Sequence, residues 1–383
     1  MSNIPHLLIL GGGFGGLSAA NEIRNNLSSS QIEITVIDKK DWFMVGFTKL
    51  WIIRGTRTFE NSTGSLTELT KKEINFVKEE ILQIDLQNKK IKTTTRILSY
   101  DFLIISMGAV LAPEQIPGLS ENGMNLYDHT QLLEIHNKLK KMKSGNLVIS
   151  IMGMPYKCPP APFEASLLIN SMLKEEGVRE SVQIHFYSPA AITLPAAGPE
   201  ISRKILNLIN SENIVFHDSC KIKSVEKNKL IFQNGMEANF DLLLAIPPHV
   251  APKVVYESGL AKEGGFIPIN RDCKTAFENV YAVGDVTTLS VTDTMAVPKA
   301  GVFAEGEALT VAQNIISKIN SKKESSLFNG KGGCFIESGR DTASLIEVDM
   351  FSEPKPSAKL TEFTAKHLDE KIQFEKERLL KWL

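Results

Sequence analysis

Two cysteines lie in segments whose composition suits sulfur chemistry, and Cys158 is the more informative of them. It lies in the proline-rich segment 155–162, where proline stiffens the backbone and is tolerated in the first turn of a helix. A helix N-terminus and the neighbouring Lys157 both favour a thiolate over a thiol. We therefore predict that Cys158 is a rigidly held nucleophile; the alternative is a small residue that fills a turn.

The second thiol, Cys334, follows Gly332 and Gly333 at the start of the C-terminal region. The two glycines predict a permissive turn, and on its own this cysteine suits packing as well as chemistry. Cys220 and Cys273 lie in neither kind of segment, and we predict that both are structural. The four cysteines are scattered and form no CxxC pair, so neither a disulfide framework nor a structural zinc site is expected.

A glycine-rich loop follows the first apolar run of the chain, and it predicts a phosphate-binding turn. Gly11, Gly13 and Gly16 come directly after the predicted strand 6–10, and a helix and a second strand then lead to Asp38. The glycines allow a tight turn, a close approach of backbone to a pyrophosphate, and close packing of helix on strand. Asp38 is placed to accept hydrogen bonds from a ribose. The alternative is a glycine turn that only packs.

Two later segments suggest which dinucleotide binds. Segment 100–108 is a predicted buried strand that ends at Gly108, and segment 275–285 is another that ends at Gly284 and Asp285. With the first loop, they resemble the three signatures of flavoproteins that have two dinucleotide-binding domains. The resemblance implies FAD, with the pyrophosphate on the first loop and the Asp285 carboxylate on the ribityl-phosphate part. The alternative for Asp285 is a cap at a strand end.

A second α/β unit interrupts the FAD-binding segments, and its glycine loop is altered. After the predicted strand 147–152 the chain keeps Gly153 but then places Cys158 and prolines where the later glycines would be. After the next predicted strand, Ser188 and Pro189 replace the acid or base that would hold the adenosine ribose. The other predicted elements of this unit are a strand at 183–187, helices at 163–174 and 201–210, and a strand at 241–246.

These patterns predict an α/β protein with two Rossmann-like domains of the glutathione-reductase kind and a C-terminal region with an amphipathic helix. The FAD domain is expected to be discontinuous. The expected domains are an FAD-binding domain at 1–115 and 265–325, a second domain with Cys158 at 116–264, and a C-terminal, quinone- and membrane-facing region with Cys334 at 326–383.

The stretch from Cys158 to Glu164, followed much later by the glycine-flanked Cys334, resembles the family of sulfide:quinone oxidoreductases and flavocytochrome c sulfide dehydrogenases. The resemblance implies that Cys158 and Cys334 form a disulfide or polysulfide bridge beside the flavin, which sulfide attacks by thiol–disulfide exchange. Cys334 would be the sulfur nearer the flavin. Some family members use a third cysteine or attach FAD covalently, but segments 125–127 and 41–50 contain no cysteine, so noncovalent FAD is expected.

The resemblance also implies roles for Lys299 and His129. Lys299 would lie near the pyrimidine end of the flavin and stabilise its reduced form; the alternative is a solvated surface lysine. Asp128 and His129 resemble a family pair near the sulfide entrance, and an imidazole whose ordinary pKa is near neutrality suits a proton carrier. A helix-capping pair is an equal alternative.

Composition fits a protein outside the nucleic-acid-binding and membrane-spanning classes. The chain has 383 residues, 43% hydrophobic and 23% charged, with a net charge of −1, so no general charge favours nucleic acid. No apolar stretch approaches the roughly 20 residues of a membrane span, and a strand begins too early for a signal peptide. We expect a cytoplasmic protein, peripheral to the membrane.

The predicted amphipathic helix at 363–383 would contact the membrane and help form a quinone pocket, as the resemblance implies. Phe335 and Phe351 are candidates to sandwich the quinone ring; the equal alternative is that both are core residues. Its polar face carries both signs of charge, so packing on the protein itself or on a second copy is equally open. The expected activity is FAD-dependent oxidation of sulfide to polysulfide, with quinone as acceptor. The alternatives are an NADH:quinone oxidoreductase of the same fold and a non-catalytic flavin-holding subunit.

Overall fold

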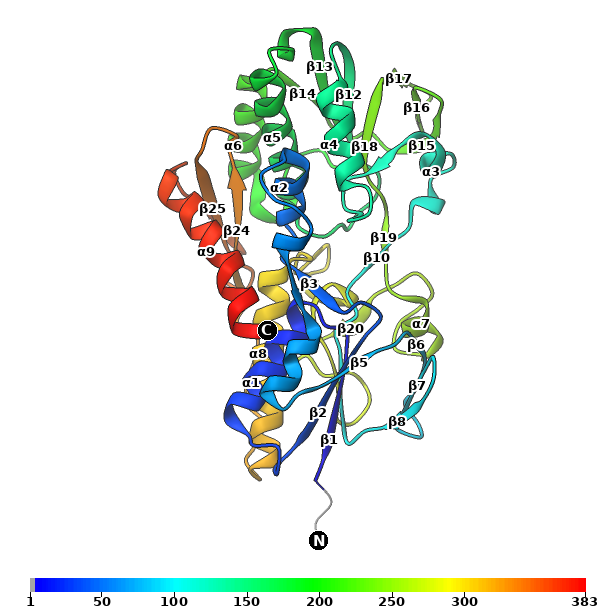
Figure 1. The fold of residues 1–383 in the computed structure, drawn as a ribbon, viewed down its shortest axis with the longest axis vertical. Helices are drawn as coiled ribbons and strands as arrows, with labels where there is room; N and C mark the ends of the chain where they lie inside the picture. The colour runs from blue at the N-terminus through cyan, green and yellow to red at the C-terminus, as the bar shows by residue number, and fades with distance from the viewer. Residues whose placement is uncertain (1–3) are drawn as a thin grey trace.

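A computed structural model describes residues 4–383, and a parallel five-stranded sheet forms the core of its lower half (Figure 1). The central strands are buried on both faces, as expected of a parallel sheet that is covered on both sides, whereas the edge strand at 75–78 is partly exposed. Helices α1 (Phe14–Asn26) and α8 (Gly301–Ile319) lie side by side against it. In spatial order the strands are β21 (Val280–Ala282), β9 (Phe102–Ile105), β1 (His6–Leu10), β2 (Glu33–Asp38) and β5 (Asn75–Lys78).

A second parallel sheet forms the upper half of the molecule. Its strands in order are β11 (Met124–Asn125), β18 (Leu242–Ile246), β12 (Gly145–Ile151), β13 (Val182–Tyr187) and β14 (Ile214–His217). Three helices pack around it: α4 (Leu132–Lys141), α5 (Ala161–Glu175) and α6 (Gly198–Ser211). The five elements predicted for this unit are confirmed, with ends that differ by at most three residues. The α/β fold with parallel sheets is therefore as predicted.

Smaller elements connect and edge the two sheets. The chain passes between them twice, and the two passages pair as β10 (Val110–Leu111) and β19 (His249–Val250). The remaining strands are β3 (Trp42–Met44), β4 (Thr63–Ser65), β6 (Ile81–Asp85), β7 (Lys90–Thr93), β8 (Ile97–Ser99), β15 (Ile222–Glu226), β16 (Lys229–Phe232), β17 (Glu237–Asn239), β20 (Ile267–Ile269), β22 (Thr287–Thr292) and β23 (Met295–Ala296). The remaining helices are α2 (Thr48–Arg54), α3 (Leu119–Asn122) and α7 (Lys253–Glu257).

The C-terminal region begins with an antiparallel sheet of β24 (Lys331–Glu337), β25 (Ala343–Asp349) and β26 (Ser357–Leu360). Cys334 lies in the middle of β24, so the glycine turn predicted there is wrong. The glycines are needed for packing instead: a Cβ on Gly332 would lie 2.6 Å from the ring of Phe303 on α8. Glycine lets β24 pack closely on α8, which a larger residue would prevent.

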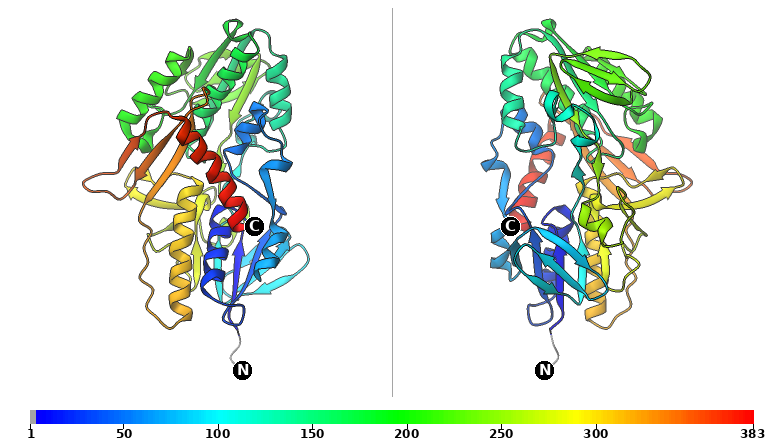
Figure 2. Two further views of the ribbon diagram at one scale, coloured as in Figure 1. Left: turned by 60° about the vertical axis from the view of Figure 1, so that its left-hand side comes forward. Right: turned by 90° about the vertical axis from the view of Figure 1, so that its right-hand side faces the viewer.

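The last helix, α9 (Ala365–Trp382), runs from the C-terminal sheet down to the first glycine loop (Figures 1 and 2). Trp382 at its end is buried, with its ring 5.3 Å from that of Phe14 and 5.5 Å from that of Phe43. This end of the helix packs on the protein itself, whereas Leu380 beside it is 79% exposed. Among residues 4–383, no helix is both long and apolar enough to span a bilayer.

Candidate active site

Cys158 is held by its backbone at the start of α5. Its φ is +52°, a left-handed conformation that non-glycine residues adopt rarely and at some cost. Its amide donates to the carbonyl of Lys299 at 2.7 Å, and its own carbonyl accepts from the amide of Ala161 at 2.9 Å. The hydroxyl of Tyr127 also donates to this carbonyl, at 3.4 Å. Contacts from three separate segments therefore fix the direction of the thiol, in agreement with the rigid turn predicted from the prolines.

Cys334, which lies far from Cys158 in the sequence, is placed in the same region by β24. It lies opposite Ile346 in the β24–β25 pair and is half-buried, as is Cys158. Both are free thiols, and they lie close enough that charge on Cys334 raises the pKa of Cys158. The fold thus brings the two thiols within electrostatic reach of each other at the altered glycine loop.

Burial makes both cysteines poorer acids than the sequence suggested. It raises the pKa of Cys158 well above its ordinary value, and Cys334 and Glu164 raise it further. Burial and Glu164 likewise raise the pKa of Cys334 to about 12. The Ala161 amide at the start of α5 lowers the pKa of Cys158, and the charge of Cys158 raises the pKa of Lys157, so both groups act in the predicted direction. Burial is nevertheless the largest effect on the pKa of each thiol.

A buried ion cluster links the cysteines to the C-terminal helix. Lys371 of α9 is fully buried and bonds to both Glu164 of α5 and Glu337 of β24, the latter at 2.7 Å. The indole of Trp51 also donates to Glu337, at 2.5 Å. Burial raises the pKa of Glu164 to about 7, and Lys371 opposes this rise. Glu164 belongs to the stretch that carried the family resemblance, whereas no sequence pattern indicated that Lys371 would be its partner.

The first glycine loop has the shape that a dinucleotide phosphate requires. A Cβ on Gly16 would lie 1.9 Å from the carbonyl oxygen of Gly11, so glycine is needed for α1 to reach the loop. Gly13, in contrast, faces open space, where a ligand can approach the backbone. The carboxylate of Asp38 accepts from the amide of Gly12 at 2.8 Å, which holds the end of β2 against the loop.

The other predicted flavin residues surround a hollow beside α8. Asp285 is half-buried, and its carboxylate receives no hydrogen bond within residues 4–383; burial raises its pKa, against the opposing effect of Lys157 and Lys299. An acceptor without a donor suits the hydroxyls of a ribityl chain, so the residues fit FAD. Gly108 and Gly284 both have positive φ, and the space beside Gly108 is open.

Lys299 is a buried residue, which excludes the solvated surface lysine. Its ammonium donates to the carbonyls of Asp285 and Thr287, at 2.8 and 2.9 Å, and lies 3.3 Å from the ring centre of Phe266. Burial lowers its pKa to about 8. A positive group is therefore fixed beside the hollow.

His129 lies in an aromatic corner near Lys49. Its ring centre is 4.8 Å from that of Trp42 and 5.9 Å from that of Phe59, and its Nδ1 is 3.7 Å from the Asp128 carboxylate. Burial and Lys49 lower its pKa, whereas Asp128 raises it. Asp128 accepts from the amide of Thr130 at 2.9 Å, so it also stabilises the turn before α4.

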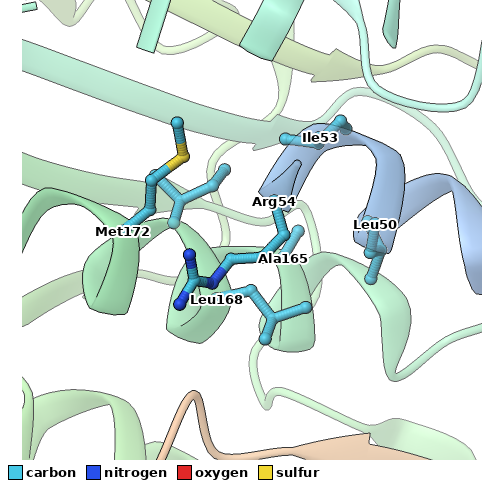
Figure 3. A pocket seen from close by; sticks show the side chains of 7 residues that line it. Leu50, Ile53, Arg54, Ala165, Leu168 and Met172 are labelled. Carbon is cyan, nitrogen blue, oxygen red and sulfur yellow. The ribbon is translucent and has the colours of Figure 1, made fainter. Parts of the chain in front are cut away.

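Helix α2 places Lys49 at this corner. Although it lies among the first-sheet segments in the sequence, it packs against α4 and α5 of the upper half. Figure 3 shows the small apolar hollow between α2 and α5, with Leu50 and Ile53 facing Leu168 and Met172. This packing fixes the position of α2 against the segment that carries Cys158.

The loop after β12 has lost the means to bind a second dinucleotide. A Cβ on Gly153 would lie 2.9 Å from the Cα of Pro248, so this glycine serves packing. Prolines 159 and 160 have no amide hydrogen to offer a phosphate at the start of α5. Within residues 4–383, no group of three or more histidine, cysteine or acidic side chains is arranged to hold a metal.

The chain matches two protein-family models. The model described as pyridine nucleotide-disulphide oxidoreductase covers residues 5–150 and 176–312. A second, described as the central part of the flavoprotein chain of sulfide dehydrogenase (flavocytochrome c), covers residues 130–190, which include Cys158.

Individual relatives fall into two groups. The sulfide-quinone reductase of Aquifex aeolicus is 26% identical over 88% of this chain and 82% of its own, and its crystal structure superposes with a TM-score of 0.90 over 99% of this chain and 91% of that chain, at 25% identity. The mitochondrial sulfide:quinone oxidoreductase of Schizosaccharomyces pombe is 24% identical over 92% of this chain and 82% of its own. A type II NADH:quinone oxidoreductase of Staphylococcus aureus is 21% identical over 82% of this chain and 83% of its own.

Proposed function

Since the chain belongs to the pyridine nucleotide-disulphide oxidoreductase family, we propose that it is an FAD-dependent enzyme that oxidises sulfide at Cys158 and Cys334 and passes the electrons to a quinone. One observation carries the proposal: two free thiols lie within electrostatic reach of each other at the loop where a second dinucleotide would otherwise bind. The similarity to two enzymes named for sulfide and quinone supports it.

The sulfur chemistry balances at the two cysteines. A hydrosulfide ion attacks a Cys158–Cys334 bridge at Cys158; a new sulfur–sulfur bond forms, the bridge breaks, and Cys334 leaves as a thiolate. When the thiolate and the persulfide rejoin, the bridge is one sulfur longer, and one proton and two electrons are released. Bound FAD supplies the two-electron acceptor.

Glu164 is placed to take the proton. It raises the pKa of both cysteines, so it lies within electrostatic reach of each. With its own pKa raised to about 7, its carboxyl group can accept and release a proton near neutral pH. His129, which lies within electrostatic reach of Lys49, would pass protons to solvent.

The quinone pocket is proposed between β24 and α9. Phe335 follows Cys334 on β24, and its ring lies 6.3 Å from that of Phe374 on α9. Phe351 instead packs on Phe328 and lies under the guanidinium of Arg271, so Phe335 is the better candidate. Because quinones reside in the lipid, we also propose a peripheral membrane contact through the exposed side of α9.

Anaerobic reduction of the flavin tests the activity. Sulfide should bleach the visible absorbance of the oxidised holoenzyme, and NADH should not, because the loop after β12 offers prolines in place of phosphate-binding amides. Bleaching by NADH alone would assign the chain to the NADH:quinone branch. Bleaching by neither would leave a flavin-holding subunit.

A further inference from the structure

Lys49 and Lys157 both lie within electrostatic reach of Cys158, and neither has a carboxylate ion-pair partner among residues 4–383. Lys49 donates one hydrogen bond, at 2.7 Å, to the carbonyl of Tyr127, the residue whose hydroxyl contacts Cys158. Neither lysine forms an ion pair within residues 4–383, and burial is the first cause of the lowered pKa of each. Half-buried ammonium groups are normally paired, so two without partners require a reason.

The charges around Lys49 repel it more than they attract it. Lys157 and Lys40 both lower its pKa, whereas Asp128 and the Cys158 thiol raise it. The ammonium of Lys40 lies 4.4 Å from the ring centre of Trp42, the indole that also covers His129.

Asp285 is the carboxylate that raises the pKa of Lys157. This carboxylate is the proposed partner of the FAD ribityl chain. Asp128 raises the pKa of Lys49, but its carboxylate already accepts hydrogen bonds from the amide and hydroxyl of Thr130. An anion at this position would satisfy the unused donors and reduce the repulsion.

We propose that Lys49 and Lys157 bind the anionic sulfur substrate, as hydrosulfide or the terminal sulfur of a polysulfide, and thereby make Cys158 selective for anionic over neutral sulfur donors. The inference rests on the proposed function and adds the residues that determine its substrate class. Lys49 has three N–H donors and uses one on Tyr127, which leaves two for the anion.

The dependence on pH separates this role from a structural one. The pKa of Lys49 is lowered to about 7, so the ammonium loses its proton as the pH rises through neutrality, and kcat/KM for sulfide falls on the alkaline side. The groups facing Lys49 are Lys157, Lys40, Asp128, Cys158 and His129. Replacement by arginine, which stays charged, should remove the alkaline fall, whereas methionine should lower kcat/KM at all pH values.

The decisive experiment measures binding of thiocyanate, a sulfur anion that does not reduce the enzyme, to purified oxidised holoenzyme. Binding is followed by the shift in the visible flavin spectrum and by calorimetry. We expect Lys49→Met and Lys157→Met each to weaken binding about 10- to 100-fold, as for loss of a hydrogen bond to a charged group. Lys49→Arg should still bind thiocyanate. The matched control is Lys39→Met, which replaces an exposed lysine and should bind thiocyanate as the wild type does.

The outcomes distinguish the two proposals. Equal binding by Lys49→Met and the wild type overturns the anion site, and so does loss of FAD from Lys49→Met, which would make Lys49 a flavin contact. If thiocyanate binding depends on Lys49 but sulfide is not oxidised by the wild type, the anion site stands and the proposed function fails.

Discussion

The two glycine loops of this chain occupy equivalent places at the end of the first strand of a parallel sheet, and they have diverged in opposite directions. The loop at 11–16 keeps the glycine that α1 requires and open space beside Gly13. The loop at 153–160 keeps only Gly153, which packs on Pro248, and replaces the phosphate-binding amides with prolines and Cys158. The same βα connection thus serves a cofactor in one half and a thiol in the other, because a helix N-terminus positions whatever its loop presents.

Replacing either thiol gives the largest effect and leaves the first loop unchanged. We expect Cys158→Ser and Cys334→Ser to abolish steady sulfide-dependent quinone reduction, since a hydroxyl cannot form the sulfur–sulfur bond. Both variants should keep FAD at the wild-type ratio, because the first loop is untouched. Cys220→Ser is the control and should retain activity. Full turnover by either active-site variant would remove the cysteine pair from the mechanism.

A substitution in the first loop should have the opposite effect, which is loss of FAD. Gly16→Val should lower FAD content at least 10-fold, because even a Cβ would meet the Gly11 carbonyl at 1.9 Å. The absorbance ratio of flavin to protein measures this. Gly153→Ala in the second loop should leave FAD content unchanged, and equal losses in the two variants would contradict the division of roles.

The ion cluster on α9 joins the two regions, so breaking it should weaken both. Lys371→Met leaves Glu164 and Glu337 without their buried partner, a change that typically costs about 3–5 kcal/mol of unfolding free energy. Urea unfolding of the holoenzyme measures it. Lys381→Met, on the exposed side of the same helix, is the matched control and should leave the midpoint in place. A small effect at Lys371 would mean that the apolar packing of Trp382 holds α9 without the cluster.

The smallest expected effect concerns Glu307, which is buried beneath Gly284 and accepts its amide at 2.6 Å. Burial raises its pKa to about 8, far above the value in an unfolded chain. The folded state therefore holds the proton more tightly, and stability should fall as the pH rises from about 4.5 to about 8. Glu307→Gln, which carries no such charge, should reduce this fall by about 1 kcal/mol per pH unit. Parallel stability curves for the two proteins would contradict the raised pKa.

The sequence predicted much of this molecule because its signals are local. The apolar runs at 6–10 and 147–152, the glycines that follow the first of them, and the prolines around Cys158 each act on their own neighbours, and the structure has the expected strands, loop and helix. One local signal led to a wrong prediction. The glycines before Cys334 read as a turn but serve the contact of β24 with Phe303.

The tertiary structure decided what depends on burial and on partners distant in the sequence. Folding brings together residues that are between 78 and 207 positions apart in the sequence. Cys334 comes within electrostatic reach of Cys158, Lys371 bonds to Glu164, and Lys49 donates to Tyr127. Desolvation, which raised the thiol pKa against the pull of a helix N-terminus, exists only once the chain has closed around the site. The sequence by itself therefore determined the elements and the reactive residue types, while folding alone determined their charge states and partners.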